Sequence, residues 1–196
     1  MQLEFDNPTH TYRIDGRVVP SVTQVLDPLL ELDGIPHDVL EAARVFGTHV
    51  HEAVNLMVRC QLDWSRLDPY LLPCVNGAKN FLKDTGFIVL ASELRVCSPK
   101  LRCAGTLDLD GILNEWPSVI DWKSTTVVPP TVGPQTSAYE QMRREQSGGR
   151  KRKRFCVQLG GQFPRGYKLH ELKDPSDYNI FVSALNIHHW RAKRAH

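Results

Sequence analysis

The segment from Gly105 to Lys123, GTLDLDGILNEWPSVIDWK, contains two extended stretches that both carry acidic side chains. Side chains at positions i and i+2 of a strand share a face, so Asp121 and Lys123 in the second stretch point the same way. A hairpin-like pairing of the two stretches would set Asp108 beside Asp121, with the lysine next to both. The D-x-K pattern alone fits a surface salt bridge equally well, and such a bridge contributes at most ~1 kcal/mol.

Close carboxylates imply a particular chemistry. Asp108 and Asp121 would repel each other unless a cation lay between them. Mg²⁺ suits such a gap because it is a hard ion that takes carboxylate, water and phosphate oxygens. A lysine beside that ion can orient or deprotonate a water molecule and offset negative charge on a phosphorane-like transition state. With Lys123, the two carboxylates therefore indicate phosphodiester hydrolysis.

The residues before this segment are expected to be mainly helical. Ser21 is a predicted N-cap, Asp38 and Glu41 have the spacing of a capping box, and Gly86 ends a helix. Gly47-Thr48 predicts that one helix stops there and another begins. The predicted helices cover residues 22–30, 38–46, 49–60 and 68–85.

Before the helices, the chain opens with a predicted hairpin of strands 11–14 and 18–19 that turns at Asp15-Gly16. The second half of the chain changes to a strand period, with strands predicted over 87–90, 93–97, 102–113, 118–123, 155–159 and 166–171. A helix is predicted over 135–146, and a last helix begins near Pro175 with Asp174 as its N-cap. The order predicts an α/β fold, with a central mixed β-sheet flanked by helices. We expect one domain over 1–196, divided into a mainly helical part (1–86), a sheet with one helix (87–175) and a C-terminal helix (176–196).

Charge divides unevenly along the chain. Residues 1–98 carry 8 Lys/Arg and 13 Asp/Glu, whereas residues 99–196 carry 16 and 9. The second half is therefore where a polyanionic partner is expected. The five cysteines are scattered without a C-x-x-C pair, which argues against a disulfide framework and a zinc ribbon. We expect neither a signal peptide nor a membrane span, and we expect a cytoplasmic location.

Four short motifs follow one another across residues 47–139. They are Gly47-Thr48-x-x-His51, Asp108 within GTLD, Asp121-Trp122-Lys123 within IDWKS, and Gln135-x-x-x-Tyr139. In this order they resemble the PD-(D/E)XK nuclease superfamily, and within it the branch of RecB nuclease domains, Cas4-like exonucleases, and phage and mitochondrial exonucleases. The N-terminal H-x-Y…G…VPSVT pattern also resembles phage-encoded members, which extends the likeness over most of the chain.

The resemblance implies a restriction-endonuclease-like core and a role for each matched position. It implies Mg²⁺ or Mn²⁺ held by His51, Asp108, Asp121 and the backbone carbonyl of Trp122. Catalysis would be carried by Asp108, Asp121 and Lys123, which acts on the attacking water, and by Glu93 as the extra acid that some members use. Gln135 and Tyr139 share one helix face and would contact the substrate strand or brace the lysine. Members of this branch that hold an iron–sulfur cluster have three cysteines after the Gln/Tyr helix, whereas here only Cys156 follows Tyr139, so we expect no cluster. The chain has no G-x-x-x-x-G-K-[ST] motif, so we expect no ATP.

Simpler interpretations remain open for several of these residues. His51 could be a hydrogen-bonded core histidine, and Tyr139 could merely pack. Gln135 could be a helix residue without a ligand. Asp110 alternates with Asp108 along the same strand and could share its face, although the motif favours Asp108.

A run of five cations follows the Gln/Tyr helix. It could be a solvated loop or a nuclear-localisation signal, but in a nuclease of this layout phosphate contact is the better interpretation. The predicted substrate-binding residues of this run are Arg150, Lys151, Arg152, Lys153 and Arg154.

These features lead us to expect a Mg²⁺- or Mn²⁺-dependent deoxyribonuclease, an exonuclease rather than an endonuclease because of the branch resembled. DNA ends or single strands would be its substrate, in recombination, repair or replication. A recombinase, a single-strand-binding protein or a helicase would be its protein partner. The alternatives are a catalytically silent nucleic-acid-binding protein and a nuclease subunit that needs a partner.

Overall fold

The computed structural model describes residues 1–30 and 34–194 of the chain. Its strands are β1 (Leu3–Asp6), β2 (Thr11–Ile14), β3 (Arg17–Val19), β4 (Ile88–Ser98), β5 (Cys103–Leu113), β6 (Trp116–Lys123), β7 (Lys153–Leu159) and β8 (Tyr167–Glu171). Its helices are α1 (Val22–Leu26), a 3₁₀ turn η1 (Asp27–Leu29), α2 (His37–Val58), α3 (Leu72–Thr85), α4 (Val132–Ser147) and α5 (Asp177–Ala192). The last two residues of the predicted C-terminal helix lie outside the described residues.

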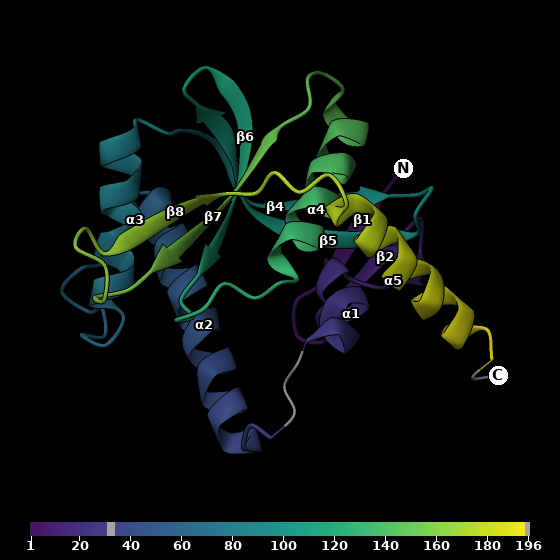
Figure 1. The fold of residues 1–196 in the computed structure, drawn as a ribbon, viewed down its shortest axis with the longest axis horizontal. Helices are drawn as coiled ribbons and strands as arrows, with labels where there is room; N and C mark the ends of the chain where they lie inside the picture. The colour runs from purple at the N-terminus through teal and green to yellow at the C-terminus, as the bar shows by residue number, and fades with distance from the viewer. Residues whose placement is uncertain (31–33, 195–196) are drawn as a thin grey trace.

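A five-stranded sheet with the order β4-β5-β6-β7-β8 forms the centre of the molecule (Figure 1). Neighbouring strands are antiparallel except for β6 and β7, which are parallel. A parallel pair needs a crossover connection, and α4 supplies it between β6 and β7. The sheet is therefore mixed, as the sequence predicts.

Helices cover both faces of this sheet. On one face, α2 and α3 pack against apolar side chains that include Leu109, Ile120 and Trp122. On the other face, α1, α4 and α5 pack against Leu107 and Val119. The predicted fold class, an α/β fold with a central mixed sheet between helices, is confirmed. No helix in the described ranges combines the length and apolar character needed to cross a membrane.

The N-terminal hairpin is confirmed, but it belongs to a three-stranded sheet whose first strand, β1, is not predicted from the sequence. Ser21 caps α1 in a capping box with Gln24, as predicted for the cap. The predicted helix over 22–30 is shorter and ends in η1, because Pro28 interrupts it. The hydroxyl of Tyr12 lies 2.7 Å from that of Thr106, which ties this small sheet to β5.

Three local expectations were wrong. Helix α2 runs unbroken through Gly47-Thr48, where the Thr48 hydroxyl donates to the carbonyl of Arg44. Glu41 forms an ion pair with Arg44 instead of a capping box with Asp38, and the helix begins after Pro36. The two strands predicted over 87–97 are one strand, β4, bent by an irregularity at Val89–Ala91. Glycine and threonine do not stop a helix whose apolar face packs on both sides of them.

Helix α5 is capped two residues after the predicted position. Its N-cap is Ser176, not Asp174. The Asp174 carboxylate instead accepts hydrogen bonds from the backbone N–H and the hydroxyl of Ser176. The helix begins later than expected because this Asx turn comes before it.

Candidate functional site

Three acidic residues lie at one level across neighbouring strands. In the β4–β5 register Ser92 pairs with Leu109 and Leu94 with Leu107, which places Glu93 opposite Asp108. The β5–β6 ladder ends at the pair Leu109–Ile120, one step before Asp121 would face Asp108. The sheet thus brings Glu93, Asp108 and Asp121 to one place.

Asp108 occupies the point where β5 and β6 separate. Its carboxylate accepts a hydrogen bond of 2.8 Å from the backbone N–H of Trp122 and thereby replaces a rung of the ladder. Only 9% of Asp108 is exposed. Although burial opposes ionisation, the positive charges of His51 and Lys123 hold the pKa of Asp108 below its usual value. Asp108 is therefore an anion in this site.

Glu93 has a backbone conformation that is unusual for a strand. Its φ is 48°, in the left-handed region that non-glycine residues rarely adopt, and its side chain lies at the exposed rim of the site. Partial desolvation and the negative charge of Asp108 raise the pKa of Glu93 to about 7. Backbone strain of this kind concentrates at functional sites.

Helix α2 brings His51 to the acids. The imidazole Nδ1 lies 3.3 Å from a carboxylate oxygen of Asp108. Burial disfavours its charged form, but the charge of Asp108 and the hydrogen bond to it outweigh this and raise the pKa of His51 to about 9. One turn further, Asn55 accepts a hydrogen bond of 2.8 Å from the Ser92 hydroxyl, next to Glu93. The contact between Asn55 and Ser92 is not predicted from the sequence. The i, i+4 spacing of His51 and Asn55, which puts both side chains on one helix face, is the only sequence feature that indicates it.

Lys123 and Asp121 form a buried ion pair. The ammonium nitrogen lies 2.7 Å from Oδ2 of Asp121, and that oxygen has no partner in hydrogen-bond alignment among the residues described. Burial and the charge of Asp108 raise the pKa of Asp121, although Lys123 partly offsets this. Burial lowers the pKa of Lys123, but Asp121 and Asp108 more than compensate and raise it overall. Lys123 is therefore a cation, suited to donating hydrogen bonds and stabilising negative charge and not to removing a proton.

Gln135 and Tyr139 lie on α4 beside this cluster. The Gln135 amide is 3.4 Å from the Tyr139 hydroxyl. Tyr139 is buried, and burial together with the negative charge of Asp121 raises its pKa well above the usual value. Its ring packs on the backbone of Gly105, where a Cβ atom would come within 2.6 Å of a ring carbon. Gly105 therefore lets Tyr139 approach the site from the other side of the sheet.

Replacing Gly105 with alanine is expected to destabilise the fold by about 1–3 kcal/mol, because the added methyl group overlaps the Tyr139 ring. Urea denaturation measures this as a lower midpoint at constant slope. Gly161→Ala is the matched control, since a Cβ there meets only an ordinary contact of 3.6 Å. An unchanged midpoint for Gly105→Ala would contradict the described packing.

The donor set suits a divalent cation. One atom each from His51, Glu93 and Asp108 lies within 4.8 Å of the others, the spacing of ligands around one ion. The buried Asp121 carboxylate, paired with Lys123, lies close enough to Asp108 and His51 for their charges to affect its pKa. Mostly carboxylate donors suit a hard divalent cation. The structure thus groups four of the predicted metal and catalytic residues with Lys123, whereas Trp122 contributes its N–H to Asp108 and buries its ring against Phe81.

The His51–Asp108 pair predicts a pH dependence in metal-free protein. The pKa of His51 is about 9 when folded and 6.5 in its ordinary state, so the folded chain holds the proton more tightly. The resulting stabilisation is complete below pH 6.5 and is lost as the pH rises through about 9. Denaturation in a chelator should therefore show a smaller decline between these pH values for His51→Gln than for wild type. The exposed His49 gives the control His49→Gln, which should keep the wild-type slope; equal slopes for all three would exclude the pair.

The basic run was predicted to contact substrate phosphate, but it lies away from this site. Its last two residues begin β7, where Lys153 pairs with Ser118, five residues before Lys123 on β6. Arg152 and Arg154 are engaged internally: Arg152 with Asp110, and Arg154 with Asp177. Their guanidinium groups balance buried carboxylates, so the prediction that the whole run contacts phosphate is corrected for these two.

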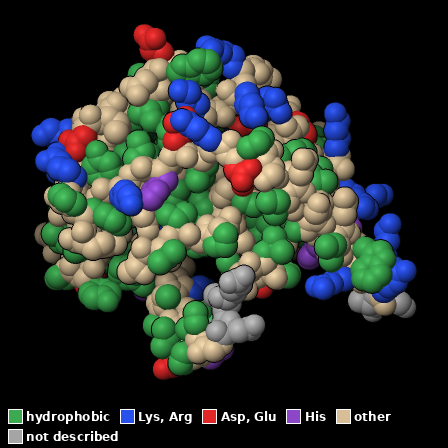
Figure 2. Space-filling view, viewed as in Figure 1, with side chains coloured by type: hydrophobic (Ala, Val, Ile, Leu, Met, Phe, Trp, Pro, Cys, Tyr) green, Lys and Arg blue, Asp and Glu red, His purple; other side chains and the backbone are tan. Residues whose placement is uncertain are grey.

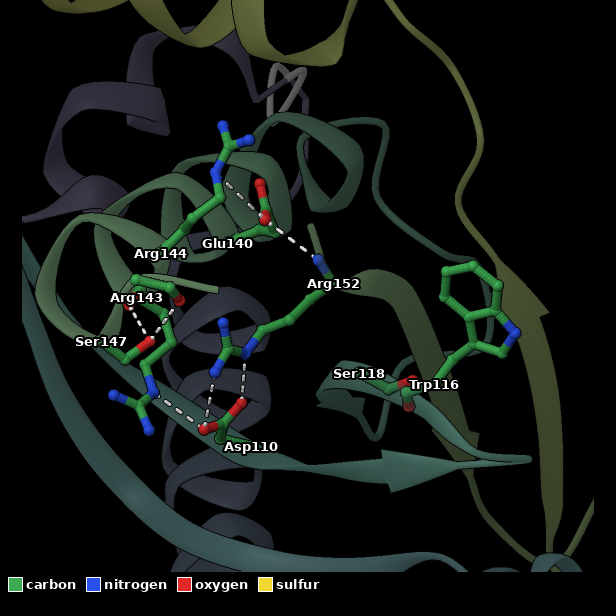
Figure 3. Close-up of polar contacts among 9 residues, drawn as sticks. Asp110, Trp116, Ser118, Glu140, Arg143, Arg144, Ser147 and Arg152 are labelled. Atoms are coloured by element: carbon green, nitrogen blue, oxygen red, sulfur yellow. Dashed lines mark hydrogen bonds and ion pairs between the residues drawn. The ribbon is translucent and has the colours of Figure 1, made fainter. Parts of the chain in front are cut away.

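Asp110 belongs to a separate cluster (Figure 3). Its carboxylate accepts hydrogen bonds from Nε of Arg143 at 2.8 Å and from Nε of Arg152 at 2.6 Å. The backbone N–H of Arg152 donates to Glu140, which pins the start of β7 to α4. Asp110 therefore does not join Asp108, which contacts α2.

Comparisons with known proteins find only distant structural similarity. No protein-family model and no curated protein matches the chain. The solved structure of an alkaline exonuclease, LHK-Exo, from Laribacter hongkongensis is 13% identical over 89% of this chain and 91% of that one, with a TM-score of 0.37. LHK-Exo in complex with dAMP gives 12% identity, coverage of 90% and 92%, and a TM-score of 0.35. Similarity at this level is too loose to carry a conclusion about activity.

Proposed function

We propose that the chain is a divalent-metal-dependent deoxyribonuclease of the PD-(D/E)XK superfamily. The observation that carries this proposal is the meeting of Glu93, Asp108 and Asp121 across three strands, with Lys123 paired to Asp121 and His51 to Asp108. A structural salt bridge alone does not account for three carboxylates at one level across neighbouring strands, because close carboxylates repel one another. A metal site for phosphate chemistry accounts for them.

Each residue then has a defined task. Glu93, Asp108, Asp121 and His51 would hold the ion, which when bound polarises phosphate oxygens and acidifies water. The Lys123 ammonium, paired to Asp121, stabilises negative charge on the phosphate during attack. Tyr139, hydrogen-bonded to Gln135, supports the site from α4. Lys123 thus acts by stabilising negative charge. The sequence also allowed it to deprotonate the attacking water, and we do not assign it that task.

The finer assignment rests on the four sequence motifs. We infer the RecB/Cas4-like branch, with exonuclease activity on DNA ends or single strands in recombination, repair or replication, using Mg²⁺ or Mn²⁺. The chain is taken as one nuclease domain over 1–196, acting in the cytoplasm. A helicase, recombinase or single-strand-binding protein is the expected kind of protein partner.

Cleavage of end-labelled DNA tests the proposal. Linear single and double strands labelled at the 5′ or 3′ end, and a circular single strand, are incubated with Mg²⁺, Mn²⁺ or a chelator. We expect metal-dependent release of nucleotides from linear DNA and resistance of the circle. Cutting of the circle would replace exonuclease with endonuclease, and cleavage only with an added helicase would identify a partner-dependent subunit. Binding without cleavage under every condition would overturn the proposal.

A further inference from the structure

Trp116 is an exposed aromatic side chain surrounded by cations. It begins β6, and 40% of it is exposed. The guanidinium carbon of Arg150 lies 4.0 Å from the ring centroid, and Nζ of Lys153 lies 5.1 Å from it. An exposed ring with an arginine and a lysine close to it puts an aromatic face and positive charge at one place on the surface.

A shallow depression of about 290 Å³ adjoins this ring. It is lined by the segment from Lys151 to Arg154, which leads into β7, and by the segment from Glu171 to Lys173 at the end of β8. Lys151 and Lys173 are exposed there, and Lys173 pairs with a partly exposed Glu171 at 2.8 Å. We call the set Trp116, Arg150, Lys151, Lys153 and Lys173 the Trp116 patch. Lys and Arg side chains gather along the upper edge in Figure 2, where Figure 1 shows the β5–β6 turn and the segment entering β7.

The patch is held in place by the cluster in Figure 3. Arg152 is hydrogen-bonded to Asp110 and Glu140. These bonds anchor the backbone at Arg152, and so they hold its neighbours Lys151 and Lys153 next to Trp116. Two consecutive glycines with positive φ, 66° and 90°, precede Arg150 and let the chain turn back over the ring. The buried ion pair of Arg152 thus supports the surface cations on either side of it.

We propose that the Trp116 patch is a second binding site, for the unpaired bases and phosphates of a single DNA strand. Bases stack on indole rings and on arginine planes, and surface lysines track phosphates. Bases of a duplex are already stacked inside the helix, so an exposed ring favours the unpaired bases of a single strand. Trp116 precedes Lys123 by seven residues on the same strand, about 23 Å in extended chain, so the patch is distinct from the acidic site.

The identity of the strand as DNA rests on the proposed function, but binding at the patch does not require cleavage. A strand held at both places would be retained between successive cuts. The two proposals can therefore fail separately: Lys123→Ala should lose cleavage and keep binding at the patch.

Fluorescence anisotropy in a chelator tests the site with a labelled single strand of about 16 nucleotides and a hairpin duplex of the same sequence. Trp116→Ala should weaken single-strand binding by about 5- to 100-fold and affect duplex binding much less. Trp116→Phe should retain part of the affinity. Lys151→Ala and Lys153→Ala should each lower the salt dependence by about 0.7 for every phosphate that the lysine neutralises in the wild type.

Trp190 supplies the matched control. It is also exposed, and Arg194 lies over its ring at 4.2 Å, but it belongs to α5 and not to the patch. Trp190→Ala should bind both probes as wild type does. Unchanged single-strand affinity in Trp116→Ala, or equal losses for single strand and duplex, would overturn the inference. Should Trp116→Ala unfold, quenching of intrinsic fluorescence by the single strand decides: it must be smaller in Trp116→Phe than in wild type.

Discussion

Lys123→Ala is expected to lower the cleavage rate by about 100- to 10,000-fold, with a smaller effect on KM. The ammonium group lies against Asp121 inside the site, and its raised pKa keeps it charged. The substitution removes the only feature of Lys123 that the prediction uses, its ammonium group, which lies next to the carboxylates of Asp108 on β5 and Asp121 on β6. A group that acts mainly on the transition state lowers kcat more than it raises KM.

The control for this prediction is Lys100→Ala, which removes an exposed lysine from the turn between β4 and β5. It should cleave as the wild type does. Lys123→Ala should still fold, because the raised pKa of Asp121 allows that carboxyl group to take up a proton once its partner is gone. Wild-type kcat in a folded Lys123→Ala protein would contradict the role given to this residue.

Asp108→Asn is expected to abolish both metal binding and cleavage, with a loss of more than ~100-fold in Mn²⁺ affinity. Asp108 is the central acid: it lies opposite Glu93, accepts from the Trp122 backbone and pairs with His51. The amide keeps its shape but not its charge, so the ion loses its main anionic ligand. Isothermal titration with Mn²⁺ measures the affinity directly.

Asp110→Asn provides the comparison, because Asp110 lies two residues along the same strand and is fully buried. It balances Arg143 and Arg152, so its replacement should destabilise the fold by about 3 kcal/mol while leaving Mn²⁺ affinity unchanged. The opposite pattern, in which Asp110→Asn loses the ion and Asp108→Asn retains it, would show that the wrong acid was assigned.

The sequence predicted β5 and β6 well because the signals there were local. An apolar stretch that ends in Asp-Trp-Lys specifies both a strand and the direction of its last side chains. Asp108 was found from the preceding strand for the same reason. The mixed sheet followed from the order of strands with one helix between them, which leaves few possible connections.

Errors arose where distant contacts decide the outcome. Gly47-Thr48 looked like a helix stop, but packing of α2 across the sheet carries the helix through both residues. Glu93 was predicted as a site residue only from the family resemblance. Its position depends on a positive φ, and no neighbouring glycine in the sequence indicates that conformation. The run of five cations looked uniform, whereas Asp110 and Asp177, far away in sequence, draw Arg152 and Arg154 into the interior.

A crystal structure of the protein soaked in Mn²⁺ tests the central claim most directly, through the anomalous signal of the metal. An ion bonded at about 2 Å to a carboxylate oxygen of Asp108, with Glu93, His51 or Asp121 completing its coordination, is the predicted result. Manganese bound only elsewhere on the protein, with the His51–Asp108 and Lys123–Asp121 pairs unchanged, would contradict it.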